Sequence, residues 1–142
     1  MTASARPPAF VRNADGILSV SGMSLLDIAA QHGAPLYVYS GDGIRSDYRR
    51  FADAVAPAGG AVHFALKSNS ALGVIALLAR AGAGADIVSG GEMARALSAG
   101  VPAEKIVFSG VGKSAHEIAD ALDAGIGQLN AESPQEVEAI SQ

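Results

Sequence analysis

A unit of strand, turn and helix recurs four times after residue 62, and this repeat constrains the fold more than any other feature of the sequence. Each expected strand is a short apolar run that ends on a polar residue, at Lys67, Ser89, Ser109 and Asn130. These four residues are separated by 22, 20 and 21 positions. Strands that alternate with helices at nearly constant length predict successive βα units and a parallel sheet.

The expected helices carry start and stop signals. Three of them open with a serine that is followed three residues later by a glutamate, which is the pattern of a capping box. These pairs are Ser89 with Glu92, Ser114 with Glu117, and Ser133 with Glu136. Glycines follow the expected helix ends, where a left-handed residue is needed. They are Gly82, Gly100 and Gly125.

This pattern fits either a (β/α)8 barrel or an open, doubly wound sheet. In both folds ligands bind outside the carboxyl ends of the strands, where the four polar residues gather. A barrel needs eight units and typically about 250 residues. Four units are present, so a barrel built from this sequence would stop about halfway.

The part that precedes the repeat has different signals. Residues 10–12 and 16–20 flank a turn sequence at 13–16 and predict a hairpin. Ser24 opens a short helix that Gly33 stops. Residues 36–39 follow Pro35 and are expected to form a strand. Residues 43–57 place apolar side chains at helical spacing and predict an amphipathic helix.

Composition excludes several classes of function. A net charge of -4 and a pI near 5.2 provide no basic surface, so no nucleic-acid partner is expected. Cysteine is absent, which excludes disulfides and cysteine-ligated zinc. The three histidines lack metal-ligand spacing, so no metal is expected. No run has the length of a signal peptide or a membrane span, and we expect a cytoplasmic protein without membrane contact.

Lys67 is the leading candidate for chemistry. It ends the apolar run that begins at Val62, and strand alternation would place it on the same face as Ala65 and His63. A lysine amine held away from water can become a nucleophile that forms a Schiff base with a carbonyl. The alternative is a lysine that extends from a strand end into water.

Two carboxylates occur in the next expected strand and helix, at Asp86 and Glu92. Asp86 falls inside an apolar strand, where a carboxylate is costly unless a cation or hydrogen-bond donors meet it, and Lys67 on the adjacent strand is the expected partner. The alternative is that Asp86 lies at the solvated start of that strand. Glu92 is explained by its place in a capping box, and this role does not prevent a second role in a site.

Residues 109–114, with the sequence SGVGKS, lie between a strand and a helix and invite comparison with a phosphate-binding loop. The nucleotide-binding pattern would require glycine at position 107, which is Val107. Phosphate binding at an ordinary helix N-terminus remains an alternative. A turn with the capping residue Ser114 explains the segment without any ligand.

Four motifs, in this order and spacing, closely resemble the diaminopimelate decarboxylase family. They are FALKSN at residues 64–69, GADIVSGGE at 84–92, IVFSGVGKS at 106–114 and NAES at 130–133. The resemblance extends from about Phe10 to the last residue. These enzymes are decarboxylases that use pyridoxal 5'-phosphate and have an alanine-racemase-like barrel. The resemblance therefore implies an α/β fold that is the N-terminal half of a pyridoxal-phosphate-binding (β/α)8 TIM barrel.

The resemblance also implies a site and a reaction. Lys67 would be the catalytic residue and would hold pyridoxal phosphate as a Schiff base, with Asp86 and Glu92 near that linkage. The amine of a small amino-acid substrate would displace Lys67, and loss of carbon dioxide would convert meso-diaminopimelate to L-lysine. Ornithine, arginine and carboxynorspermidine decarboxylases would share Lys67 and Asp86 and are the alternatives within the same chemistry.

The family implies a domain arrangement as well. Residues 1–34 would join a β domain that is built mostly from a C-terminal part absent from this sequence, and residues 35–142 would form the first half of the barrel. A homodimer is expected for the full-length enzyme. We expect the 142 residues alone neither to close a barrel nor to catalyse decarboxylation. A truncated, non-catalytic partner that docks through its open sheet edge is the alternative from another class.

Overall fold

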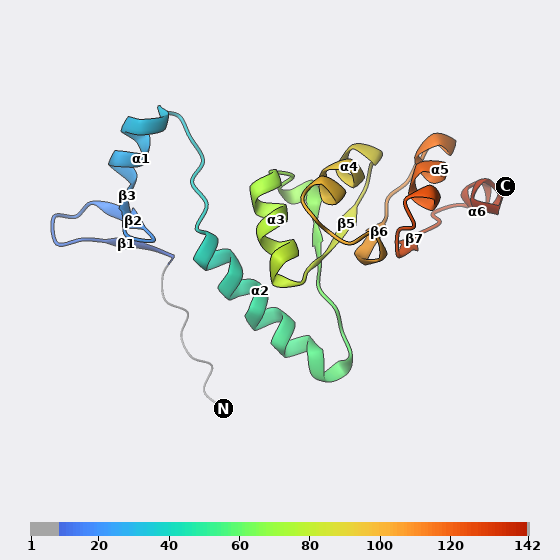
Figure 1. The fold of residues 1–142 in the computed structure, drawn as a ribbon, viewed down its shortest axis with the longest axis horizontal. Helices are drawn as coiled ribbons and strands as arrows, with labels where there is room; N and C mark the ends of the chain where they lie inside the picture. Colours follow the sequence, from blue (N-terminus) through green and yellow to red (C-terminus); the bar gives the residue numbers. More distant parts are fainter. Residues whose placement is uncertain (1–8, 142) are drawn as a thin grey trace. The chain divides into compact units, whose positions relative to one another are not determined.

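The computed structural model describes residues 9–141, in two compact units (Figure 1). One unit is Met1–Asp47 and the other is Tyr48–Gln142, so the division falls within the helix α2 (Gly41–Val55). Of the helices in the described part, none is both long and apolar enough to cross a membrane.

The first unit contains a small antiparallel sheet with one helix beside it. The strands β1 (Phe10–Arg12), β2 (Leu18–Val20) and β3 (Met23–Ser24) pair in chain order. The turn between β1 and β2 forms because the Asn13 side-chain oxygen accepts hydrogen bonds from the backbone N–H groups of Asp15 and Ile17, at 3.1 and 2.8 Å. The predicted hairpin is confirmed.

The short helix α1 (Leu25–His32) is also confirmed. The Ser24 hydroxyl accepts hydrogen bonds from the N–H groups of Leu26 and Asp27 and satisfies donors that have no partner within the helix. Gly33 follows the last turn with a φ of 83°, and its N–H donates to the carbonyl of Ala29.

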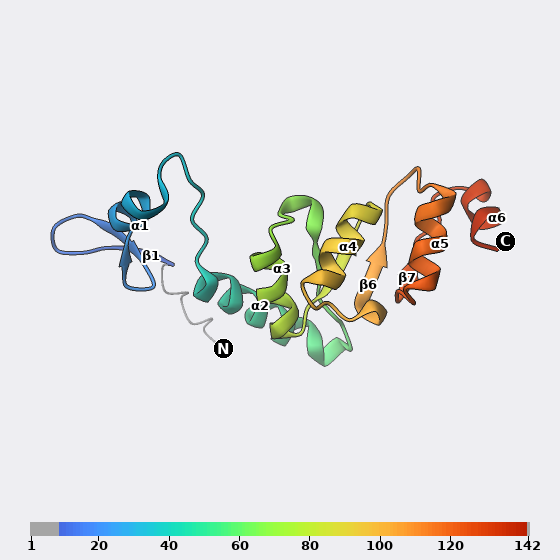
Figure 2. The same cartoon turned by 45° about the horizontal axis from the view of Figure 1, so that its top comes forward.

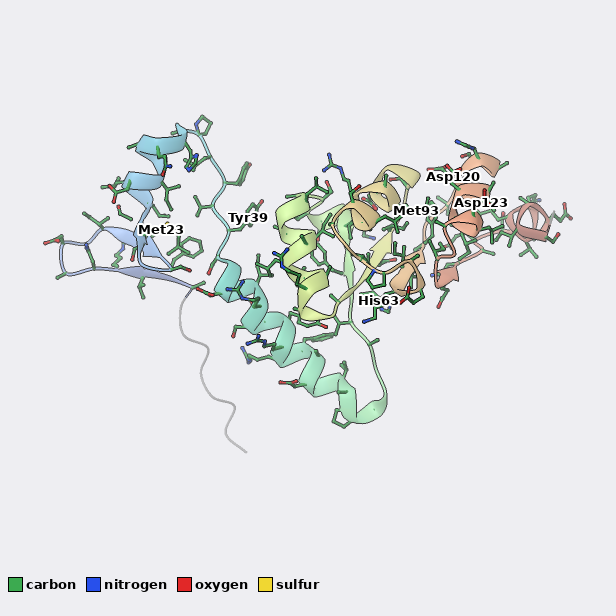
Figure 3. The ribbon with its side chains drawn as sticks, viewed as in Figure 1. Met23, Tyr39, His63, Met93, Asp120 and Asp123 are labelled. Atoms are coloured by element: carbon green, nitrogen blue, oxygen red, sulfur yellow. The ribbon has the colours of Figure 1, made fainter. Side chains whose placement is uncertain are left out.

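The predicted strand at residues 36–39 is wrong. This segment is extended, but within residues 9–141 it joins no sheet, and Tyr37 is 91% exposed. A strand needs a neighbouring backbone to complete its hydrogen bonds, and apolar alternation alone does not provide one. Figure 3 labels Tyr39 on this connection, which leads into α2.

The second unit repeats strand and helix four times, as the sequence predicts. The strands β4 (His63–Ala65), β5 (Gly84–Ile87), β6 (Ile106–Phe108) and β7 (Gln128–Leu129) form a parallel sheet in chain order. The helices that follow them are α3 (Leu72–Ala81), α4 (Gly90–Ser98), α5 (Ala115–Asp123) and α6 (Pro134–Ser141).

The helices of this unit follow one another along the sheet, each packed against the next (Figures 1 and 2). A doubly wound sheet would instead reverse its strand order and carry helices on both faces. Strands added in one direction, with neighbouring helices in contact, are the arrangement of a (β/α)8 barrel.

The two faces of the sheet differ in their environment. One face is apolar and packs under the helices, and its largest side chains, Ile87, Ile106 and Phe108, are fully buried. These residues join Ile75 of α3 and Met93 of α4 in one hydrophobic cluster. Of these residues, Figure 3 labels Met93. The opposite face contains the registered row Ala65, Asp86, Val107 and Gln128, which is half-buried or exposed.

Two glycines allow close packing at the starts of strands. A Cβ atom added to Gly127 would overlap the backbone carbonyl of Glu104, and one added to Gly84 would overlap the carbonyl of Lys105 and the ring of His63. The short 3-10 turn Ala103–Lys105 therefore lies directly against both positions.

We expect Gly127→Ala to lower the free energy of unfolding by about 1–3 kcal/mol, because backbone must shift to accept the methyl group. Gly73 in α3 is the matched control, since an added Cβ there meets nothing within 4 Å. Gly73→Ala should raise the free energy of unfolding by about 0.5–1 kcal/mol. Denaturant unfolding of both variants measures the difference, and equal effects would contradict the close approach.

Candidate active site at the carboxyl ends of the strands

Lys67 lies in a 3-10 turn immediately after β4. The strand ends at Ala65, so Lys67 follows the strand and does not end it as predicted, and the turn comprises Leu66–Ser68. Within this turn the Leu66 side chain is fully buried while Lys67 is exposed. The Ser68 hydroxyl closes the turn by donating to the Ala65 carbonyl at 2.7 Å. The backbone therefore fixes the position of the Lys67 Cα atom. The Lys67 side chain extends into solvent, which is the alternative stated for a lysine at a strand end, and its amine is not held away from water.

Asp86 lies in β5 and accepts a hydrogen bond from Ser109, the residue that follows β6. The Ser109 hydroxyl donates to Oδ1 of Asp86 at 2.7 Å, and Asn130 Nδ2 donates to the Ser109 oxygen at 3.0 Å. Ser109 and Asn130 each lie two positions beyond the row that contains Asp86, so all three side chains share one face of the sheet. A row of hydrogen-bonded polar side chains therefore crosses the sheet at the carboxyl ends of β5, β6 and β7.

The predicted partner of Asp86 is wrong. Among residues 9–141 no ion pair joins Lys67 to Asp86, and the carboxylate is satisfied by a hydroxyl donor instead. The sequence contained the signal for Ser109 and Asn130, because both are polar residues at strand ends. What it lacked was the register that places them on the same face as Asp86.

Glu92 forms half of its predicted capping box. Its N–H donates to the Ser89 hydroxyl at 3.2 Å, as expected. Its carboxylate, however, accepts from the N–H of Val88 at 2.8 Å rather than from that of Ser89. Because Val88 immediately follows β5, Glu92 ties the end of this strand to the first turn of α4.

Glu117 completes a full capping box with Ser114 at the start of α5. Its second carboxylate oxygen accepts a hydrogen bond from the N–H of Gly90 at 2.8 Å. One side chain therefore accepts from backbone N–H groups at the starts of two neighbouring helices, α4 and α5. The N–H of Gly90, followed by the N–H and hydroxyl of Ser114, holds the pKa of Glu117 below its usual value of 4.5.

Glu136 is buried and pairs with the buried Lys113. The Glu136 carboxylate accepts from the N–H of Glu132 at 2.8 Å, from the N–H of Gly112 at 3.2 Å and from Lys113 Nζ at 3.2 Å. The N–H of Glu132 and then Lys113 lower the pKa of Glu136. Ser133 caps α6 through the Glu136 N–H, so the box predicted there is also half formed.

Lys113 was not predicted as a structural residue. Its side chain is 1% exposed, and besides Glu136 it donates to the backbone carbonyls of Gly110 and Asn130, both at 2.7 Å. The ammonium also lies 5.6 Å from the centre of the Phe108 ring. The nearby glycines and capping serine indicated only a loop, and no spacing in the sequence signals that the lysine turns inward.

Residues 42–142 match the family model described as pyridoxal-dependent decarboxylase, pyridoxal binding domain. The chain belongs to this family. The (β/α) repeat observed here is therefore the N-terminal part of the TIM-barrel domain of the family, which confirms the predicted fold class.

Individual members of the family are closely similar. The chain is 51% identical over 122 residues to a diaminopimelate decarboxylase of Pseudomonas fluorescens, covering 86% of the chain and 29% of that protein. It is 47% identical over 131 residues to that of Zymomonas mobilis, covering 90% and 31%. A crystal structure of the diaminopimelate decarboxylase of M. jannaschii with L-lysine superposes with a TM-score of 0.88 at 36% identity, covering 93% and 32%. The chain thus spans about a third of the length of these relatives.

The residues at the strand ends fit a pyridoxal group in their chemistry. Such a group needs an amine that can form a Schiff base, and Lys67 offers an exposed amine that has no hydrogen bond or ion pair within the part of the chain that the structure describes. The half-buried Asp86 adds a carboxylate on the open face of the neighbouring strand.

We expect Glu117→Gln to change the pH dependence of stability. Because the pKa of Glu117 is lower in the folded than in the unfolded protein, its ionised form stabilises the fold above about pH 4.5. That contribution is lost as the pH falls through the folded-state pKa. The stability difference between the native protein and Glu117→Gln should therefore be largest near pH 7 and shrink below pH 4.5. Unfolding midpoints measured from pH 7 to pH 3 provide the test, and a difference that grows in acid would contradict it.

Breaking the buried pair should destabilise the protein strongly. We expect Lys113→Met to lower the free energy of unfolding by clearly more than a surface substitution does, because Glu136 is left without its cation. Lys105→Met is the matched control, since Lys105 is exposed and donates only a 3.4 Å hydrogen bond to the Gly82 carbonyl. It should change stability by no more than about 0.5 kcal/mol. Similar losses in the two variants would show that the pair contributes little.

Proposed function

We propose that this chain is the cofactor-anchoring part of a diaminopimelate decarboxylase, in which Lys67 binds pyridoxal 5'-phosphate through its amine. The observation that carries the proposal is the exposed Lys67 amine directly beyond a strand whose neighbours bring Asp86, Ser109 and Asn130 to the same edge. Ligands of parallel α/β barrels bind at this edge.

A comparison of the three lysines of the sequence supports Lys67. Lys113 is buried, and its ammonium makes three hydrogen bonds. Lys105 precedes β6, at the opposite end of the strands, and donates to the Gly82 carbonyl. Only Lys67 combines an accessible amine with a place at the carboxyl ends, and an accessible amine is what attack on a carbonyl requires.

Asp86 and Glu92 are proposed to lie beside the bound group, each with a different role. Asp86 places a negative charge on the open face of the sheet, where it would stabilise a protonated nitrogen of the cofactor or substrate. Glu92 is held by the N–H of Val88 and keeps the end of β5 next to α4. When bound, pyridoxal phosphate supplies the electron sink that decarboxylation of an amino acid requires.

The substrate proposal is meso-2,6-diaminopimelate, which would yield L-lysine and carbon dioxide. In this reaction one carbon–carbon bond breaks, its electron pair stays on the α-carbon, and a proton replaces the lost carboxylate. Identities of 51% and 47% to proteins named diaminopimelate decarboxylase support this choice over other basic amino acids. A place in lysine biosynthesis, a cytoplasmic homodimer, and a β domain that includes residues 1–34 complete the proposal for the full-length protein.

Reduction with borohydride followed by peptide mapping tests the assignment. In the full-length protein loaded with pyridoxal phosphate, we expect the reduced cofactor on the peptide that contains Lys67. Lys67→Ala should abolish this labelling and lower the rate of decarboxylation by several orders of magnitude, because no other lysine of this chain is placed to replace it. Lys105→Ala, at the far end of the strands, should leave labelling and rate unchanged.

Two results would overturn the proposal. One is labelling at another residue, or none, in the unmodified protein. The other is faster turnover of ornithine or arginine than of diaminopimelate in a substrate panel, which would assign the chain to a related decarboxylase.

A further inference from the structure

A series of three hydrogen bonds connects the buried ammonium of Lys113 to the carboxylate of Asp86, and it passes through the backbone and the side chain of Asn130. We call this series the hydrogen-bond line. Lys113 Nζ donates to the backbone carbonyl of Asn130 at 2.7 Å. The Asn130 amide donates to the Ser109 oxygen at 3.0 Å, and the Ser109 hydroxyl donates to Asp86 at 2.7 Å. The line begins in the β6–α5 loop, passes through the end of β7 and returns through β6 to β5.

The direction of this line is determined by its donors. The Asn130 side-chain oxygen accepts from Gln128 Nε2 at 2.5 Å, so the amide nitrogen of Asn130 is the end that faces Ser109. A serine hydroxyl has one proton, and once Asn130 donates to its oxygen that proton is available for Asp86. Each group thus fixes the orientation of the next, and the last donor is aimed at the carboxylate.

Lys113 donates hydrogen bonds to the backbone on both sides of the contact between Ser109 and Asn130. Its ammonium donates to the carbonyl of Gly110, the residue after Ser109, as well as to the carbonyl of Asn130. The Glu136 carboxylate balances its charge at 3.2 Å, and the Lys113 side chain is 1% exposed. Since an ammonium has three protons, these three acceptors use all of them. The lysine has no donor left for a ligand, so its effect on the site must act through the backbone that it holds.

We propose that Lys113 is a positioning residue, which sets the spacing of Ser109 and Asn130 so that these two side chains hold the Asp86 carboxylate in one orientation. This inference rests on the proposed function only in assigning Asp86 to the reaction. If Ser109 and Asn130 did not hold Asp86, removing the hydroxyl of Ser109 or the amide of Asn130 would leave the reaction unaffected.

Ser109→Ala and Asn130→Ala are the variants that test the line, because each removes one donor and leaves the Lys113–Glu136 pair in place. In the full-length protein loaded with pyridoxal phosphate we expect each to lower kcat about tenfold, since a misplacement of about 1 Å can cost roughly a hundredfold and a smaller one correspondingly less. KM and borohydride labelling of Lys67 should remain unchanged. Ser109→Thr keeps the hydroxyl and should restore kcat.

The hydrogen-bond line also has a readout that does not depend on activity. With asparagine labelled by nitrogen-15, the side-chain amide resonance of Asn130 should shift in Ser109→Ala, which removes its acceptor. It should also shift in Lys113→Met, whereas Lys105→Met is the control that should leave it in place. If Lys113→Met does not fold, the Ser109 and Asn130 variants still test the contacts with Asp86 through which Lys113 is proposed to act.

The outcomes separate this inference from the proposed function. Absence of labelling at Lys67 in the unmodified protein would overturn the proposed function, while the Asn130 resonance would still test the line. Normal labelling with an unchanged kcat in both Ser109→Ala and Asn130→Ala would overturn the positioning role and leave the proposed function standing. An Asn130 resonance that does not respond to Ser109→Ala would exclude the hydrogen bond itself.

Discussion

Burial of one face of the parallel sheet under its helices is the constraint on which the rest of the second unit depends. Ile87, Ile106 and Phe108 are fully buried on that face, and no polar group can be placed there without a partner. Because side chains alternate along a strand, fixing these residues also fixes the row on the other face, which contains Asp86. Packing of the apolar face thus also determines which face of the sheet Asp86 occupies.

The glutamates at the helix starts accept hydrogen bonds that fix the backbone between the strands and the helices. Backbone N–H groups in the loops between strands and helices, and at the starts of the helices, need acceptors that the strands and helices do not supply. Glu92 takes the N–H of Val88, Glu117 takes that of Gly90 on the neighbouring helix, and Glu136 takes those of Glu132 and Gly112. Each carboxylate therefore ties a loop at the carboxyl ends of the strands to a helix, and together they hold these loops in defined positions.

The sequence was sufficient for what depends on local patterns and insufficient for what depends on spatial neighbours. Strand, turn and helix signals predicted the parallel repeat and its helix boundaries. The strand expected at residues 36–39 was wrong because pairing requires a second backbone, which a pattern in one segment does not reveal. The partner of Asp86 was wrong for the same reason, since Ser109 meets it only once the register of β5 and β6 is known. Lys113 was missed because its three acceptors come from a loop, a strand end and a helix.

The contrast between Lys67 and Lys113 shows how one residue type can serve two purposes at the same edge of a sheet. Lys113 is surrounded by acceptors, and its three hydrogen bonds leave its buried ammonium with no free donor and no access for a ligand. Lys67 follows a fully buried leucine in a short turn, so its backbone is fixed while its amine stays accessible. Under the proposed function Lys67 is the lysine that reacts, whereas Lys113, with three acceptors around its ammonium, is proposed to hold the backbone beside Ser109 and Asn130.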